Sequence, residues 1–162
     1  SLLYVSRINK HKNQKELVEV SHKFGFDLRL VGPIDNDDYV ESIPRFSEYY
    51  LGEVSEKKLL QEYADAAVYV LPSKHEGFGL TALEAMAAGT PVVVSDKCGI
   101  QDIIEKGSNG YVYEQGNKQK LAEYIHKCID NRSKLSEGAR TTAERLTWDK
   151  TAERYRSVYL RQ

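Results

Sequence analysis

Cysteine, methionine, tryptophan and proline are all scarce in this chain of 162 residues, which holds two, one, one and four of them respectively. Cys98 and Cys128 lack the close spacing of a metal-binding pair, and two cysteines are too few for a disulfide framework. Such usage fits a reducing compartment. We therefore expect a cytoplasmic protein.

Long apolar runs and a charge excess of either sign are also missing. No apolar run approaches the about 20 residues that a transmembrane helix needs, and no signal peptide is visible. Charged residues form 29% of the chain but sum to a net charge of −1, so we expect no nucleic-acid partner. The chain lacks an initiator methionine and reads as a strand from Leu2 onwards, which predicts that it is part of a longer protein.

Strands and helices are expected to alternate along the whole chain. The predicted strands cover residues 2–5, 28–31, 49–51, 67–71, 91–95 and 110–113. The predicted helices cover residues 14–24, 55–64, 80–89, 101–105, 133–146 and 148–160, a further helix is capped by Asn117, and 35–46 holds at most a short helix. Among their apolar residues, we expect Leu60 to be buried and Ile129 to lie on an apolar face. This alternation predicts one doubly wound, Rossmann-like α/β domain over residues 1–162. Its parallel sheet of about six strands has the order 3-2-1-4-5-6 and helices on both faces.

A glycine-rich turn leads from the fourth strand into the next helix. Gly77 and Gly79 precede that helix and leave its first N–H groups bare, an arrangement that binds phosphate well. Glu84 falls within an apolar arc of the helix, where an unpaired carboxylate is costly. We therefore expect a hydroxyl or cationic partner for it. The arc is formed by Leu80, Leu83, Ala87 and Ala88.

The predicted topology brings this turn to the loop after the first strand, which holds Arg7 and Lys12. A nucleoside diphosphate fits such a crevice, with the two cations neutralising its charge and Glu84 accepting hydrogen bonds from the ribose. Glu76 would then face the group on the distal phosphate. The diphosphate itself would lie on the N–H groups of Gly79, Leu80 and Thr81.

Each of these residues also has an ordinary interpretation. The cations and Glu76 are the kind of charges that solvated loops carry, the glycines can serve a turn alone, and Glu84 can pair with a neighbouring lysine or backbone donor. Their convergence at one crevice favours a ligand site. The run Asp35-Asn36-Asp37-Asp38 is interpreted as a solvated acidic turn and not as a metal site.

The same residues resemble a known family. Glu76-Gly77-Phe78-Gly79-Leu80 followed by Glu84 resembles the Glu-x7-Glu motif of retaining glycosyltransferases of the GT-B fold, and Arg7 with Lys12 is similar to that family's Arg-x4-Lys pair. The likeness covers essentially the whole chain. It implies a C-terminal, donor-binding half whose N-terminal acceptor domain is absent here.

The resemblance also implies roles for single residues. Glu84 would hold the ribose and Glu76 would be the catalytic residue beside the transferred sugar, with the loop from Gly77 and Phe78 to Thr81 holding the donor and Val54 near the base. It implies transfer without a bound metal or cofactor. Where the family often has Gly-Gly-x-Pro-Glu, this chain has Cys98-Gly99-Ile100-Gln101-Asp102, so the donor's identity is not transferable. Asn13 replaces a frequent glycine.

The predicted function is to bind a nucleotide-diphospho-sugar, such as a UDP- or GDP-hexose. The full-length enzyme would transfer the sugar with retention to a sugar or lipid-linked acceptor, in cell-surface glycan or glycolipid assembly. Acceptor and membrane contacts would come only from the missing domain, and the isolated chain would transfer poorly or not at all. Two alternatives stay open: half of a nucleotide-sugar epimerase, which needs no acceptor, and a non-catalytic binding module. A dehydrogenase is disfavoured because the first loop lacks Gly-x-Gly-x-x-Gly.

Overall fold

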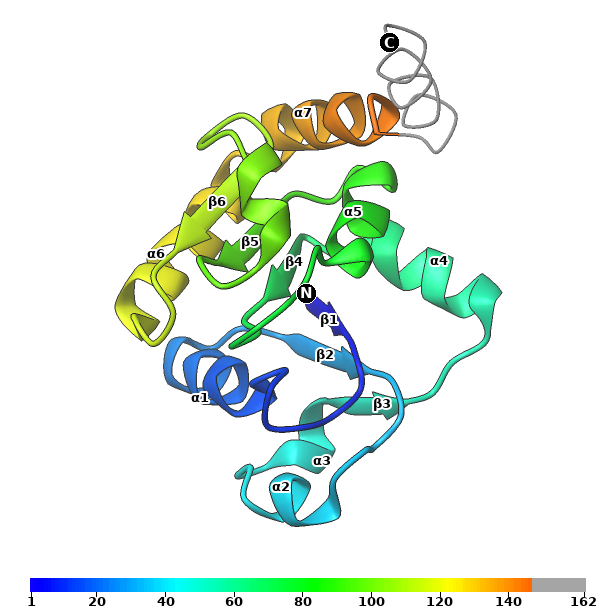
Figure 1. The fold of residues 1–162 in the computed structure, drawn as a ribbon, viewed down its shortest axis with the longest axis vertical. Helices are drawn as coiled ribbons and strands as arrows, with labels where there is room; N and C mark the ends of the chain where they lie inside the picture. Colours follow the sequence, from blue (N-terminus) through cyan, green and yellow to red (C-terminus); the bar gives the residue numbers. More distant parts are fainter. Residues whose placement is uncertain (147–162) are drawn as a thin grey trace, which may run out of the picture.

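A six-stranded parallel sheet forms the centre of the computed structural model, which describes residues 1–146 (Figure 1). The strand order is β3-β2-β1-β4-β5-β6, as predicted from the alternation of elements. The strands are β1 (Leu2–Val5), β2 (Leu28–Val31), β3 (Tyr50–Gly52), β4 (Val68–Leu71), β5 (Val92–Ser95) and β6 (Gly110–Tyr113). All residues of β4 and β5 are buried, as expected for central strands covered on both faces.

Helices cover both faces of this sheet. Figure 1 shows α1 and α6 packed together on one side, with α4 and α5 on the other and α7 beside α5. The helices are α1 (Gln14–Phe24), α2 (Asp37–Glu41), α3 (Phe46–Tyr49), α4 (Glu56–Asp65), α5 (Leu80–Ala87), α6 (Lys118–Asp130) and α7 (Arg132–Glu144). No helix within residues 1–146 combines the length and apolarity needed to cross a bilayer.

Several local predictions were wrong. A short helix, α3, precedes β3 and was missed. The helix expected over 101–105 is instead a 3₁₀ helix, η1 (Gly99–Ile103). Leu60, predicted to be buried, and Ile129, predicted to lie on an apolar helix face, are 62% and 41% exposed. The helix predicted over 148–160 lies outside the described residues.

A buried carboxylate attaches α4 to the sheet. Glu62 is 2% exposed, and its carboxylate lies 2.7 Å from Nη1 of Arg29 on β2 and 2.8 Å from Nζ of Lys58 one turn earlier. Burial raises the pKa of Glu62, but the hydrogen-bonded pairs with Lys58 and Arg29 outweigh it and leave the pKa below its ordinary value. The pair with Arg29 joins α4 to β2, whereas the pair with Lys58 lies within α4 itself. The Arg29 pair thereby helps to place Tyr63, the next residue.

We predict that Glu62→Gln lowers the free energy of unfolding at pH 7 by about 1–3 kcal/mol, because hydrogen bonds to a charged acceptor are lost. The folded-state pKa is depressed, so this contribution is fully present above the ordinary carboxyl pKa of about 4.3 and disappears as pH falls through the depressed value. Urea unfolding of both proteins between pH 7 and pH 2 measures it. A stability difference that stays constant over this range would contradict the assignment.

Candidate functional site

A cleft of about 370 Å³ opens where the carboxyl ends of β1 and β4 meet. This is the position where the strand order reverses, at which doubly wound sheets bind ligands. Seven predicted site residues line it: Arg7, Lys12, Glu76, Phe78, Gly79, Leu80 and Thr81. The loop after β1 and the turn into α5 therefore converge, although about seventy positions separate them in the sequence.

The amino terminus of α5 reaches this cleft without a cap. Gly79 stands at the N-cap position with φ 101°, and a Cβ there would lie 2.8 Å from Cδ2 of Leu71. No side chain caps the helix, and the N–H groups of Leu80 and Thr81 have no acceptor among residues 1–146. Such N–H groups, together with the helix dipole, favour an anion.

The two predicted cations lie across the cleft from α5. Lys12 Nζ forms an ion pair with Glu76 Oε2, and both side chains are about one-fifth exposed. The Arg7 side chain is exposed, and its guanidinium contacts no carboxylate within residues 1–146. In the described part of the chain, the cleft is thus bordered by one cation without a carboxylate partner, Arg7, and by one in an ion pair, Lys12.

The loop that carries Lys12 is held by its neighbours. Asn13 takes a left-handed conformation with φ 60°, which explains why glycine and asparagine are both suited to this position. Its Nδ2 donates to the carbonyl of Pro72 at 3.1 Å, and the backbone N–H of Lys74 donates to the carbonyl of His11 at 2.8 Å. The loops after β1 and β4 are therefore joined directly.

Glu84 differs from the sequence expectation in one respect. It is exposed, because α5 buries Ala82, Ala85 and Met86 and leaves Leu80 57% exposed. The predicted apolar arc was wrong, since this helix is apolar on nearly every side and its periodicity does not select a buried face. A partner was expected for Glu84, either a hydroxyl or a cation, and the structure shows a hydroxyl: Tyr63 donates to Glu84 Oε2 at 2.8 Å.

Three predicted residues lie outside the set that lines the cleft. Glu84 is one turn further along α5, Gly77 is exposed in the turn before it, and half-buried Val54 lies between β3 and α4. All three remain on segments that follow the carboxyl ends of strands. The structure does not bring Val54 into the cleft itself.

A third segment, residues 97–100, supports the turn before α5. The N–H of Glu76 donates to the carbonyl of Lys97 at 3.1 Å, and the N–H of Ile100 donates to the carbonyl of Phe78 at 2.7 Å. Cys98 is buried within this contact, and burial raises the pKa of its thiol. In the sequence, this segment is recognisable only as a departure from the family pattern. No sequence pattern predicts that it hydrogen-bonds to the turn before α5.

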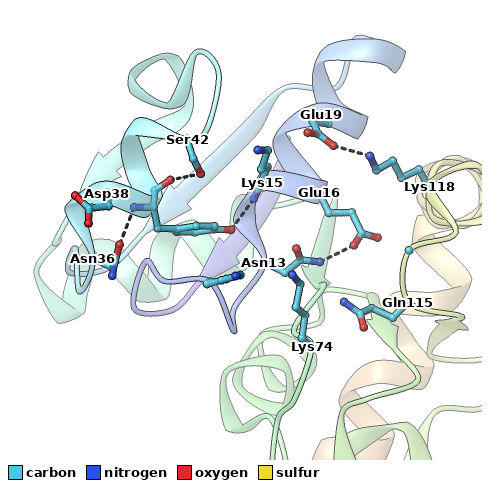
Figure 2. Close-up of a pocket in the computed structure, with 13 residues that line it drawn as sticks. Asn13, Lys15, Glu16, Glu19, Asn36, Asp38, Ser42, Lys74, Gln115 and Lys118 are labelled. Carbon is cyan, nitrogen blue, oxygen red and sulfur yellow. Dashed lines mark hydrogen bonds and ion pairs between the residues drawn. The ribbon is translucent and has the colours of Figure 1, made fainter.

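A larger cleft of about 740 Å³ lies between α1, α2 and the start of α6, and it is lined by none of the predicted donor residues (Figure 2). Its charges have both signs: Lys10, Lys15 and Lys74 face it together with Asp38. Figure 2 shows that Lys118 pairs with Glu19. Within the acidic run, Asn36 caps α2 by accepting from the Tyr39 N–H at 2.6 Å, which gives this run a structural role.

We predict that Gly99→Ala lowers the free energy of unfolding by about 1–3 kcal/mol, the usual cost of an overpacked contact. An added Cβ would overlap the carbonyl oxygen of Gly77, which is backbone and cannot move aside alone. The matched control is Gly77→Ala, on the other side of the same contact, where a Cβ meets nothing within 4 Å. Urea unfolding should leave this control within about 0.5 kcal/mol of wild type. Equal effects of the two substitutions would contradict the packing described.

Comparison with known proteins places these features in a family. The family model described as "Glycosyl transferases group 1" matches residues 1–145. A glycosyltransferase of Methanocaldococcus jannaschii is 32% identical over 98% of this chain and 44% of its own length. A D-inositol 3-phosphate glycosyltransferase of Geodermatophilus obscurus is 36% identical over 68% of this chain and 24% of its own length.

Solved structures agree with this result. Sucrose-phosphate synthase from Thermosynechococcus elongatus has a TM-score of 0.83 and 26% identity, covering 99% of this chain and 46% of its own. Anabaena HepE in complex with UDP has a TM-score of 0.78 and 26% identity, covering 89% of this chain and 43% of its own. The chain thus spans less than half of the length of each of these four proteins. It belongs to the glycosyl transferases group 1 family.

Proposed function

We propose that this chain is the C-terminal, donor-binding domain of a retaining glycosyltransferase that binds a nucleotide-diphospho-sugar. The observation that carries the proposal is the convergence of Arg7, Lys12 and the uncapped start of α5 on one cleft. Support also comes from HepE, whose solved structure contains UDP. The base and the sugar are left open between donors such as a UDP- and a GDP-hexose.

The diphosphate of the donor would lie on the N–H groups of Gly79, Leu80 and Thr81, with Arg7 opposite. Lys12 would exchange part of its contact with Glu76 for the distal phosphate. Because Glu76 then faces the sugar, its carboxylate would accept hydrogen bonds from sugar hydroxyls. Val54 would lie on the side of the base, and Gly77 and Phe78 would shape the turn that carries these contacts.

In the proposed reaction, the bond between the anomeric carbon and the distal phosphate oxygen breaks, and a bond to the acceptor oxygen forms on the same face. The acceptor's proton passes to the departing phosphate oxygen, so charge balances without another co-reactant. Negative charge grows on that phosphate as the bond breaks. Arg7 and Lys12, already in place, would stabilise it in the transition state. These two cations and the helix N–H groups would take the role that a metal ion fills elsewhere.

The acceptor would be bound by a further domain, because this chain spans less than half the length of its relatives. A sugar or lipid-linked acceptor, and any contact with a membrane, would therefore belong to the full-length enzyme. The chain alone is expected to bind the nucleotide and to transfer sugar poorly or not at all.

We predict saturable binding of UDP, GDP or ADP to this chain, measured by calorimetric titration in the presence of EDTA. Glu84→Ala and Arg7→Ala should each weaken binding more than about tenfold, because each removes a charge-assisted contact of about 1.5–3 kcal/mol. The matched control is Lys10→Ala, which removes a cation from the same loop but outside this cleft.

Unchanged affinity in Glu84→Ala and Arg7→Ala would contradict the assigned site. A larger loss of affinity in Lys10→Ala than in Arg7→Ala would indicate that the nucleotide binds in the larger cleft. If neither this chain nor the full-length protein binds UDP, GDP or ADP, the proposed function is contradicted.

A further inference from the structure

Three buried tyrosines form a row beneath the donor cleft. Tyr4 on β1, Tyr69 on β4 and Tyr63 on α4 are each 2% exposed or less. The ring centroids of Tyr4 and Tyr69 are 6.3 Å apart at 79°, and those of Tyr69 and Tyr63 are 5.9 Å apart at 45°. Edge-to-face and tilted contacts of this kind stabilise aromatic pairs.

The hydroxyl of each tyrosine contacts a different part of the proposed donor site. Tyr4 donates to the backbone carbonyl of Lys12 at 2.9 Å. The Tyr69 oxygen lies 2.7 Å from Oγ1 of Thr81 on α5. Tyr63 donates to Oε2 of Glu84, one turn further along the same helix. The row thus connects the proposed phosphate contacts to the proposed ribose contact.

Packing alone does not require the Tyr63 hydroxyl. Phenylalanine would fill the same space, and the exposed carboxylate of Glu84 would be solvated by water without a protein donor. Burial, and after it the neighbouring Tyr69, raises the pKa of Tyr63, so its hydroxyl stays protonated and donates at every physiological pH. Within residues 1–146 the other carboxylate oxygen of Glu84 has no partner and is free to accept from a ligand.

This contact selects one orientation of a flexible side chain. Figure 1 shows α4 and α5 side by side, and the salt bridge between Glu62 and Arg29 joins α4 to the sheet. Tyr63 therefore reaches Glu84 from a fixed position. A glutamate on the surface of a helix samples several rotamers, and ordering it on binding lowers affinity. A fixed donor orders it beforehand.

We propose that Tyr63 is a positioning residue that holds Glu84 ready for the ribose hydroxyls of the donor, while Tyr69 and Tyr4 position Thr81 and Lys12 for its diphosphate. The proposal rests on the proposed function and goes beyond it by naming residues that touch no substrate. It implies that removing the Tyr63 hydroxyl affects recognition of the ribose, whereas removing the Tyr69 or Tyr4 hydroxyl affects recognition of the diphosphate.

The test is calorimetric titration of this chain with UDP and GDP and with their 2′,3′-dideoxy counterparts. Wild type should prefer the ribonucleotide. Tyr63→Phe should weaken binding of the ribonucleotide by about three- to tenfold and leave the dideoxy form unchanged, so that the preference shrinks. Tyr69→Phe should weaken both forms by the same factor, because its hydroxyl contacts the phosphate side.

The matched control is Tyr113→Phe. Tyr113 is as buried as Tyr63, and its hydroxyl also contacts a carboxylate, Glu16 Oε1 at 3.2 Å, but on the opposite face of the sheet. A structural effect of losing a buried tyrosine–carboxylate contact would appear in both variants. Only Tyr63→Phe should change the ribose preference.

A second measurement isolates the coupling between the two residues. In the Glu84→Ala background, adding Tyr63→Phe should leave the affinity for the ribonucleotide unchanged, because the hydroxyl acts through Glu84. Circular dichroism checks that every variant is folded. This background keeps the test decisive even where Tyr63→Phe alone lowers stability.

Two results would overturn the inference while leaving the proposed function intact. One is an unchanged ribose preference in Tyr63→Phe, whether both nucleotide forms bind as before or lose affinity equally. The other is a further loss of affinity when Tyr63→Phe is added to the Glu84→Ala background. If neither the wild-type chain nor the full-length protein binds any of the nucleotides, the proposed function is contradicted, and the inference with it.

Discussion

At the start of α5, N–H groups lie at the cleft with no side chain to accept from them, and the other features of the site follow from this arrangement. Gly79 makes it possible, because a Cβ there would press on Leu71 and its φ of 101° is unfavourable for other residues. Unsatisfied N–H groups and the helix dipole favour an anion. Arg7 and Lys12 extend the same preference across the cleft, from a loop that only the parallel topology brings near.

Rigid surroundings hold these groups in place before any ligand arrives. The hydroxyls of the buried tyrosine row contact Lys12, Thr81 and Glu84, and residues 97–100 hydrogen-bond the turn before α5. In the proposed binding mode, the ion pair between Lys12 and Glu76 would rearrange, since these two charges pair with each other in the free chain. Because the other groups are already ordered, such a site loses little conformational entropy on binding. The Lys12–Glu76 contact would be exchanged in part for a contact with the ligand.

The sequence was informative where periodicity and topology decide the outcome. The alternation of elements predicts the strand order, and that order alone brings Arg7 to the turn into α5. It was less informative on the buried face of α5, which is apolar on nearly every side, so Glu84 is exposed where burial was expected. A hydroxyl or cationic partner for Glu84 was predicted, but Tyr63 was not identified, because α4 and α5 meet only in the folded chain. Residues 97–100 gave no pattern that predicts their hydrogen bonds to the turn.

The central claim is that the nucleotide occupies the cleft between the loop after β1 and the start of α5. A crystal structure of this chain with the nucleoside diphosphate that binds most tightly tests it most directly. We predict phosphate oxygens within hydrogen-bond distance of the N–H groups of Leu80 and Thr81, and ribose hydroxyls on Glu84. Density for the nucleotide in the larger cleft, beside Lys10, Lys15 and Lys74, would contradict the account.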